Sequence, residues 1–388
     1  MRLSAQIRFF VKAALAVGLL ATAAYANDDR AGGYRISGPH VHENLAVYLV
    51  HGASAPGPVP LTLQEAIARD AVRVIETGNV NQLEIENTGK EEVFVQAGDI
   101  VKGGKQDRVL TVSLLLAPGS GKVGIGAFCV EQGRWAARGT ESVSRFASAD
   151  ASLPSREAKL AMAMPAKPAA LAQPVAPSVS ARNAPSPAPA QRQQIAGGSD
   201  TSDRQRQVWD NVKKTQDKLA GALGANVAAS QSRSSLQLSL ESEQLRRVQK
   251  AYVEALASAA DKETDVVGLV VAVNGRVSSA DVYPSNGLFR KMWAKQLNAS
   301  VTEAIGEKAA VKASTATSVT PATPAPQPQG VAGIAAVQAF LTAAEQGKAS
   351  QRTIAGRMKL ETRDADKALL VEAARPDGGF VHRNYLAK

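Results

Sequence analysis

Apolar and polar positions alternate with a short period through the first half of the chain. Residues 71–76, 80–86 and 92–97 are brief alternating segments, and Gly, Asn and Lys turn residues separate them. This spacing predicts antiparallel strands. Thr62 and Glu65 form a capping-box pattern that predicts a short helix over 63–70. Apolar runs predict further strands at 45–50, 109–116 and 123–130.

The second half of the chain mixes the helical period with one strong hairpin signal. Residues 266–273 and 276–283 are apolar runs on either side of Asn274-Gly275, the favoured pair for a two-residue type I′ turn. Apolar residues recur at helical spacing over 203–219, 241–259 and 285–305. Near the C-terminus, a helix is predicted over 331–346 and short strands over 358–362, 369–373 and 380–385. These elements indicate an α+β fold with an antiparallel or mixed sheet covered by helices.

Two stretches rich in Pro, Ala, Ser and Thr interrupt this pattern. They contain too few large apolar residues to offset the entropy lost on ordering. We expect one main domain in two halves, with a C-terminal segment packed on it and disordered insertions between the parts. The expected bounds are 34–147 and 203–307 for the two halves, 148–202 and 308–329 for the insertions (a short helix over 156–164 within the first), and 330–388 for the C-terminal segment.

The first 26 residues read as a signal peptide. Arg2, Arg8 and Lys12 precede an apolar run over 13–24 that is short for a membrane span, and Ala24-Tyr25-Ala26 fits a small-x-small cleavage site. We expect cleavage after Ala26 and a periplasmic or secreted protein, with an uncleaved anchor as the alternative. No later stretch is apolar and long enough to predict a transmembrane segment.

The formal charge of +10 does not by itself indicate a nucleic-acid partner. Basic and acidic residues are nearly balanced over 76–145, and no basic stripe carries interleaved aromatic residues, so we expect no nucleic-acid binding. Cys129 is the only cysteine, which excludes an intrachain disulfide. Its apolar neighbours predict a buried thiol, whereas catalysis by the thiol would require a nearby base.

Two segments dense in charge, amide and glycine flank the central apolar strands, at 98–108 and 131–135. Glycines at 103 and 104 allow the backbone to turn its N–H groups towards a ligand, and cationic side chains suit a phosphate or carboxylate. We predict that the two loops converge on a small anionic ligand. The candidate ligand-binding residues are Lys102, Gly103, Gly104, Lys105, Gln106, Arg108, Gln132, Arg134 and Trp135, and the supporting acids are Glu76, Asp99, Asp107 and Glu131.

The same residues admit other interpretations. Lys and Arg could pair with the acids as a structural network that closes the sheet, and Trp135 could pack in the core. A hydrolase using Glu76, Asp99 or Glu131, with or without a metal, is a second hypothesis, and a structural or protein-interaction domain is a third. His40, His42 and His51 lack an evident third ligand, so no metal site is assigned. The sequence names neither a cofactor nor a protein partner.

The two loop motifs, together with Val273-Asn274-Gly275 and the run from Leu288 to Trp293, resemble one domain family. It is named for its association with ADP-ribosylglycohydrolases and with rhodanese–phosphatase proteins, and its members are similar to a domain of unknown function. The resemblance covers about 36–145 and 203–305. The Pro/Ala-rich insertions depart from it without touching the motifs. The resemblance implies an association with nucleotide-sugar or phosphate chemistry, but it does not imply a particular activity.

Overall fold

The computed structural model describes residues 33–134, 136–139, 141–164, 199–316 and 330–388. Three expected features lie outside the described residues. They are the signal peptide, Trp135, and the parts of the two expected insertions that span 165–198 and 317–329. No helix within the described ranges is long and apolar enough to cross a membrane.

An antiparallel sheet of eight strands joins the two ends of the chain. Its spatial order is β1-β2-β12-β13-β17-β16-β15-β14, so the C-terminal strand β17 pairs directly with the hairpin strand β13. The C-terminal segment is therefore part of the main sheet. The bounds are β1 Arg35–His42, β2 Leu45–His51, β12 Val266–Val273, β13 Arg276–Val282, β14 Lys348–Thr353, β15 Lys359–Asp364, β16 Ala368–Ala374 and β17 Phe380–Ala387.

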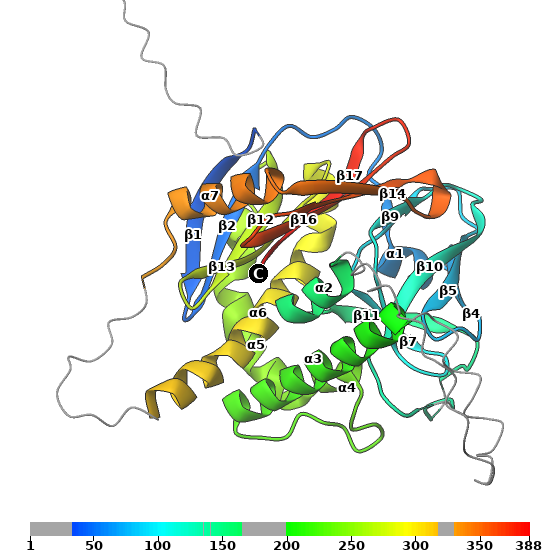
Figure 1. Ribbon diagram of the computed structural model, residues 1–388, viewed down its shortest axis with the longest axis horizontal. Helices are drawn as coiled ribbons and strands as arrows, with labels where there is room; N and C mark the ends of the chain where they lie inside the picture. Colours follow the sequence, from blue (N-terminus) through cyan, green and yellow to red (C-terminus); the bar gives the residue numbers. More distant parts are fainter. Residues whose placement is uncertain (1–32, 135, 140, 165–198, 317–329) are drawn as a thin grey trace, which may run out of the picture.

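Both faces of the sheet are buried at its inner strands β2 and β12, whereas the edge strand β14 is exposed. Along β2, Leu45, Val47 and Leu49 belong to the larger hydrophobic core, whereas Ala46, Tyr48 and Val50 belong to the smaller one. Figure 1 shows α6 (Asn286–Ala316) and α7 (Ile334–Glu345) on opposite sides of the sheet. Because successive strand residues point to opposite faces, a run of buried apolar residues suits a strand sandwiched between helices.

Two smaller sheets form the other side of the molecule (Figure 1). The six-stranded sheet has the order β11-β7-β8-β10-β5-β4, and the three-stranded sheet has the order β3-β6-β9 with one parallel pair, β3 and β6. The bounds are β3 Leu61–Thr62, β4 Val72–Glu76, β5 Gln82–Asn87, β6 Val93–Val95, β7 Asp99–Gly103, β8 Arg108–Leu110, β9 Leu114–Leu116, β10 Gly121–Cys129 and β11 Phe146–Ser152.

Helices connect and cover the sheets. Helix α1 (Leu63–Ala68) begins with the predicted capping box, in which Thr62 and Glu65 exchange hydrogen bonds. Helices α2 (Arg156–Ala163) and α3 (Ser199–Leu223) lie between the two sides of the molecule, followed by α4 (Leu236–Leu240) and α5 (Glu243–Leu256).

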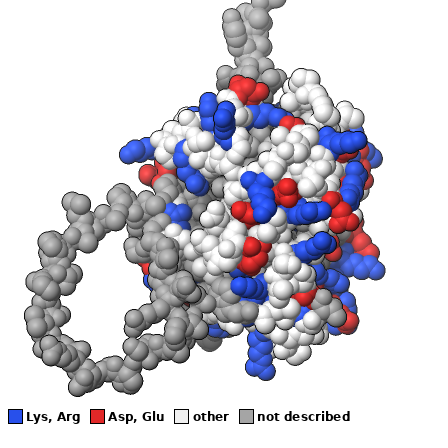
Figure 2. Space-filling view, turned by 90° about the vertical axis from the view of Figure 1, so that its right-hand side faces the viewer, with Lys and Arg blue, Asp and Glu red and all other residues white. Residues whose placement is uncertain are grey.

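The structure confirms the α+β prediction and the central hairpin. Asn274 and Gly275 both have positive φ, at 51° and 75°, as a type I′ turn requires. Cys129 is free and fully buried on β10, as predicted. Figure 2 shows basic and acidic side chains interspersed on the face that carries β4, β5 and β10.

Several predicted bounds are wrong. The expected charged loop over 99–108 begins as strand β7, because Asp99–Gly103 pairs with both β8 and β11. The expected single strand over 109–116 is two strands in different sheets, separated at Thr111–Ser113. The first expected insertion starts later than 148, since β11 and α2 are ordered there, and α6 continues past 308 to Ala316. Tertiary pairing orders segments that composition alone assigns to linkers.

Candidate functional site

The two predicted loops do converge. The Arg134 guanidinium donates to the carbonyl oxygens of Gly104, at 3.2 Å, and Gly103, at 3.3 Å. Gly103 and Gly104 have φ values of 111° and 56°, a backbone region that favours glycine. The segment after β7 and the segment after β10 therefore form one surface.

Buried carboxylates lie behind this surface and take up its charge. Asp107 is fully buried and accepts from Gly103 N at 3.0 Å, from Ser235 Oγ at 2.9 Å and from Arg138 Nη1 at 3.0 Å. Glu131, also fully buried, accepts from Arg134 Nε at 2.8 Å and from Asp107 N at 3.1 Å. Burial alone would lower the pKa of Arg138, but its hydrogen bonds to Asp107 and Glu141 raise it.

Two of the three remaining predicted cations, Lys102 and Arg108, are also paired. Arg108 is completely buried, with Nη2 3.5 Å from Glu76 Oε2, and Lys102 Nζ lies 3.0 Å from Glu241 Oε1. Lys105 makes no ion pair with a described residue. We call these paired residues the ion network: Glu76, Lys102, Asp107, Arg108, Glu131, Arg134, Arg138, Glu141 and Glu241.

The other predicted site residues are placed as follows. Gln106 is buried, and its backbone carbonyl accepts from Arg108 Nη1 at 2.8 Å. Gln132 has an exposed side chain, and its backbone exchanges hydrogen bonds with Ser234 Oγ. Asp99 lies apart from the ion network and accepts from Lys295 Nζ at 2.6 Å. Ligand binding by this loop stays a prediction, and its described cations other than Lys105 already have acidic partners.

A second polar region lies where α2, the C-terminal strands and the β8–β9 connection meet. An inner pocket of about 20 Å³ reaches Ser113, Lys159, His382 and Asn384. An outer cavity of about 410 Å³ is lined by residues of α2, α3, β14, β15 and β16, among them Arg204 and Arg352. The two share Thr111, Met162, Ala163, Leu360 and Val371 in their walls, and together we call them the cleft.

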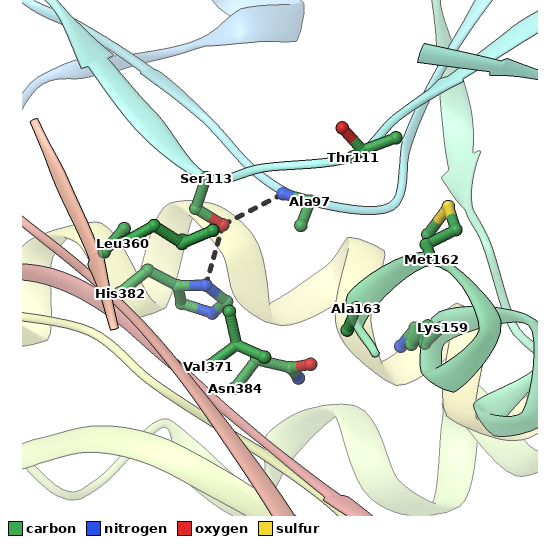
Figure 3. Close-up of a pocket in the computed structure, with 11 residues that line it drawn as sticks. Ala97, Thr111, Ser113, Lys159, Met162, Ala163, Leu360, Val371, His382 and Asn384 are labelled. Atoms are coloured by element: carbon green, nitrogen blue, oxygen red, sulfur yellow. Dashed lines mark hydrogen bonds between the residues drawn. The ribbon is translucent and has the colours of Figure 1, made fainter. Parts of the chain in front are cut away.

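A chain of hydrogen bonds starts at Ser113 and His382 in the wall of the inner pocket and leads away from it to Asp281. Ser113 Oγ lies 2.9 Å from His382 Nδ1, and His382 Nε2 lies 3.1 Å from Asp281 Oδ1. Figure 3 shows the Ser113 hydroxyl between the imidazole and the backbone nitrogen of Ala97, which donates to it at 2.9 Å. All three side chains are buried. We call Ser113, His382 and Asp281 the inner relay.

The strand pattern explains how these side chains meet. On β13, Ala280 and Val282 belong to the core beneath α7, so Asp281 points to the opposite face. Residue 281 pairs with Asn384 of β17, which places His382 on the neighbouring strand. Ser113 reaches them from the connection between β8 and β9, which is 269 residues away from His382 in the sequence.

Further polar groups fix the carboxylate of Asp281. Asn384 donates to Oδ1 at 2.9 Å and Gln96 at 3.3 Å, and Gln96 in turn accepts from the Tyr283 hydroxyl at 2.9 Å. Burial alone would raise the pKa of Asp281, but the His382 hydrogen bond, the Lys159 charge and the Asn384 hydrogen bond together lower it. Asp281 is therefore a stable buried carboxylate.

The charges that line the cleft have one sign. Lys159 lies in the inner pocket, with its amine end turned into the space in Figure 3, and Arg204 and Arg352 line the outer cavity. The described lining residues include no Asp or Glu. Partial burial and the nearby Arg204 charge lower the pKa of Arg352, as expected for two cations held close together.

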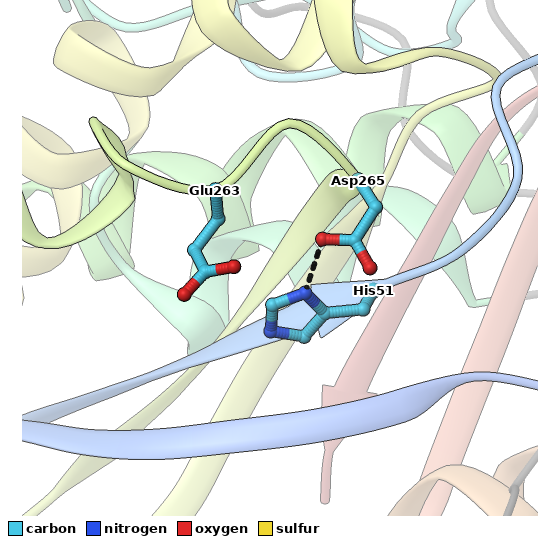
Figure 4. A group of neighbouring side chains, drawn as sticks. All are labelled: His51, Glu263 and Asp265. Atoms are coloured by element: carbon cyan, nitrogen blue, oxygen red, sulfur yellow. Dashed lines mark hydrogen bonds and ion pairs between the residues drawn. The ribbon is translucent and has the colours of Figure 1, made fainter.

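A similar hydrogen-bond chain lies at the edge of the large sheet. His51 Nε2 is 2.6 Å from Ser37 Oγ, and His51 Nδ1 is 2.8 Å from Asp265 Oδ1. Glu263 lies beside them, and ligand atoms of His51, Glu263 and Asp265 are all within 4.8 Å of one another (Figure 4). Because Asp265 and Glu263 are exposed and Arg35 also pairs with Asp265, this cluster needs no ion to be satisfied.

The sequence analysis missed the inner relay. The predicted strand at 380–385 contained His382, and the predicted strand at 109–116 contained Ser113, but no motif links them. Neither residue stands out locally, because the first segment also contains Arg383 and Asn384 and the second also contains Thr111. Only the tertiary structure brings Ser113 and His382 together.

The fold and this buried polar cleft define an α+β domain in which two sheet systems enclose a small-molecule-sized cavity. Over residues 33–386 the chain matches the ARG and Rhodanese-Phosphatase-superfamily-associated Protein domain, and it belongs to that family. The family is one of domains associated with ADP-ribosylglycohydrolase and rhodanese–phosphatase proteins. Neither the comparison with curated proteins nor that with solved structures gives a match.

Proposed function

We propose that this domain binds a small anionic ligand, of phosphate, nucleotide or ADP-ribose-like chemistry, in the cleft. The supporting observation is that Lys159, Arg204 and Arg352 line one cleft whose described walls contain no carboxylate. Guanidinium and ammonium groups suit phosphate oxygens, and an anion between Arg204 and Arg352 would relieve their mutual repulsion.

The size and character of the cleft support the same proposal. The outer cavity, at about 410 Å³, lies in the range of small-molecule sites. Phe128, Met162 and Leu360 add apolar wall to the polar groups. The predicted loop offers less, because Lys102, Arg108 and Arg134 are each engaged with acids.

A thermal-shift screen of the full chain tests the proposal. The panel contains inorganic phosphate, pyrophosphate, ADP, ADP-ribose and sugar phosphates, with neutral sugars for comparison. A ligand at about 100 times its Kd adds about 2.7 kcal/mol to the free energy of unfolding, which is several degrees at roughly 2–4 °C per kcal/mol. We expect at least one anion to give such a shift.

Three variants locate the bound anion. Arg352→Ala removes a cation of the cleft, and Arg357→Ala is the matched control, an exposed arginine that follows the same strand but does not line the cavity. Lys105→Ala removes the cation of the loop. The shift should disappear in Arg352→Ala and persist in the other two. Loss in Lys105→Ala alone would place the anion at the loop and overturn the assignment to the cleft.

We also propose that the protein is exported after cleavage behind Ala26, on the basis of the charged and apolar pattern of its first residues. N-terminal sequencing of protein recovered from the periplasm or medium should give Asn27 as the first residue. A chain that retains residues 1–26 in the cytoplasm would exclude export.

A further inference from the structure

We propose that the inner relay is the catalytic centre of an esterase, with Ser113 as nucleophile, His382 as general base and Asp281 as the carboxylate that orients the imidazole. The substrate class is a short acyl ester of an anionic alcohol. The anionic part rests on the proposed function of the cleft, whereas the nucleophile and base rest on the geometry of Ser113, His382 and Asp281 alone.

The hydrogen bonds set the direction in which the proton moves. Ala97 N–H donates to Ser113 Oγ, so the hydroxyl proton is available to His382 Nδ1, 2.9 Å away. Asp281 Oδ1 accepts at 3.1 Å from His382 Nε2, which places the proton of the neutral imidazole on Nε2. Nδ1 is then a free base that faces the hydroxyl, as nucleophilic catalysis needs, although the two ring nitrogens are exchanged relative to the Ser-His-Asp template, in which Nε2 faces the serine and Nδ1–H the carboxylate.

The surroundings hold Asp281 in the charged form that this role needs. Its Oδ1 also accepts hydrogen bonds from Asn384 and Gln96, and the chain continues through Gln96 to Tyr283. A buried carboxylate fixed in this way stabilises the imidazolium that forms when His382 takes up the serine proton. Lys159, in the same pocket, is the cation that we assign to the negative charge of the tetrahedral intermediate.

The two parts of the cleft indicate the shape of the ester. The inner pocket beside Ser113 has room for about one water, at about 20 Å³, whereas the outer cavity is about 410 Å³ and contains Arg204 and Arg352. Only the ester carbonyl would approach Ser113 through the inner pocket, and the alcohol portion with its negative charge would occupy the outer cavity. The shared wall of Met162 and Leu360 would contact the bond between them.

The reaction balances with water as the only co-reactant. Ser113 Oγ bonds to the acyl carbon while its proton moves to His382 Nδ1, and collapse of the intermediate breaks the ester C–O bond. The alcohol leaves with the proton from His382. Water then attacks the acyl-serine, gives a proton to His382, and releases the carboxylic acid while Ser113 Oγ recovers its proton.

The cluster at the sheet edge provides a matched control. Ser37, His51 and Asp265 have the same residue types, with shorter contacts of 2.6 and 2.8 Å against 2.9 and 3.1 Å in the inner relay, and His51 faces the serine with Nε2. However, Asp265 is exposed and the described cavities do not include these residues. If hydrogen bonding alone made a serine reactive, Ser37 would react as well. The cleft should confine reactivity to Ser113.

Covalent labelling of the full chain tests the inference. A small fluorophosphonate, which loses fluoride as its phosphorus bonds to a serine oxygen, is followed by intact mass and by peptide mapping. We expect one adduct, on Ser113, that is retained in Ser37→Ala and reduced at least about 100-fold in rate in His382→Gln, since removal of a triad member typically lowers catalysis by more than that. Release of p-nitrophenol from p-nitrophenyl acetate should fall in parallel in Ser113→Ala and His382→Gln.

The Ser113→Cys variant distinguishes a loss of reactivity from a loss of fold. Its thiol should react with iodoacetamide near pH 7 in a His382-dependent manner, with Cys129, buried and with a pKa raised to about 11 by burial, as an internal slow reference. An unlabelled Ser113 in folded protein, an adduct on Ser37, or equal labelling in folded His382→Gln would overturn the inference.

The two proposals fail separately. Labelled Ser113 without any anion-induced thermal shift would retain the esterase centre and exclude the anion site. An anion shift that persists in Ser113→Ala, with Ser113 unlabelled in the wild type, would retain binding and exclude catalysis. Arg352→Ala should lose the anion shift and keep the fluorophosphonate adduct.

Discussion

The ion network and the cleft use the same residue types in opposite ways. In the ion network, Arg134 and Arg138 contact Asp107 and Glu131, carboxylates that are completely buried. In the cleft, Lys159, Arg204 and Arg352 come from three distant segments, and the described walls contain no acid. Cations that are close in sequence thus hold the fold together here, and cations that meet only in space are the better candidates for a ligand.

The energetics of burial explain this difference. A buried charge is costly unless an opposite charge and hydrogen bonds compensate it, and Arg108, with none of its surface exposed, has Glu76 at 3.5 Å and the carbonyl oxygen of Gln106 at 2.8 Å as partners. Arg204 and Arg352 line the outer cavity, so a ligand bound there could contact their guanidinium groups. The charges of Arg204 and Arg352 repel each other, and an anion bound between them would reduce this repulsion.

The largest effect should follow from breaking the ion network at Asp107. Asp107→Ala removes the acceptor for Gly103 N, Ser235 Oγ and two guanidinium groups, and leaves buried positive charge without compensation. We expect a loss of about 3–5 kcal/mol in the free energy of unfolding, measured by urea denaturation. A loss below 1 kcal/mol would contradict a structural role for the network.

The matched change in the cleft is Arg352→Ala. Because Arg352 makes no ion pair with an acid among the described residues and the Arg204 charge repels it, its removal should change the free energy of unfolding by no more than about 0.5 kcal/mol in either direction. A destabilisation as large as that of Asp107→Ala would mean that the cleft cations are structural too, and the contrast between the regions would be lost.

An intermediate effect should appear in the free energy of unfolding at acidic pH. The pKa of Asp281 is lowered in the folded protein despite burial, chiefly by the His382 hydrogen bond and the Lys159 charge, so the carboxylate stabilises the fold above its unfolded pKa of about 3.9. That stabilisation is lost as pH falls through the lower folded value. Asp281→Asn should therefore have a shallower decrease in unfolding free energy below about pH 4 than the wild type, measured by denaturation at pH 3–7. Parallel curves would show that Asp281 is not held as proposed.

The smallest effect concerns access to the core beside the ion network. Burial raises the pKa of Cys129 to about 11, although the Arg108 charge opposes this. At pH 8 only about one thiol in a thousand is then ionised, so the native protein should react with a disulfide reagent far more slowly than the urea-unfolded chain. Asp107→Ala should accelerate the reaction if the network closes this part of the sheet. Rapid labelling of the native wild type would show that the strand opens readily.

Much of the fold could be predicted from local patterns. The Asn274-Gly275 turn, the capping box at Thr62 and the alternating strand of 72–76 are each decided by interactions among neighbouring residues, and all three are present. The charges and glycines of 99–103 are unfavourable for an isolated strand, so local patterns predict a loop there. Pairing with β8 and β11 supplies the hydrogen bonds that local propensity does not reveal.

The sequence by itself determined the α+β class and the burial of Cys129, because periodicity and turn chemistry act over a few residues. The convergence of the two charged loops was a prediction that only the tertiary contacts of Arg134 with Gly103 and Gly104 could decide. Only the tertiary structure decided which charges are neutralised and which hydroxyl faces a base. The position of Ser113 against His382 depends on the register of β13 and β17 and on the break between β8 and β9. Those contacts join residues hundreds of positions apart, and no short-range pattern records them.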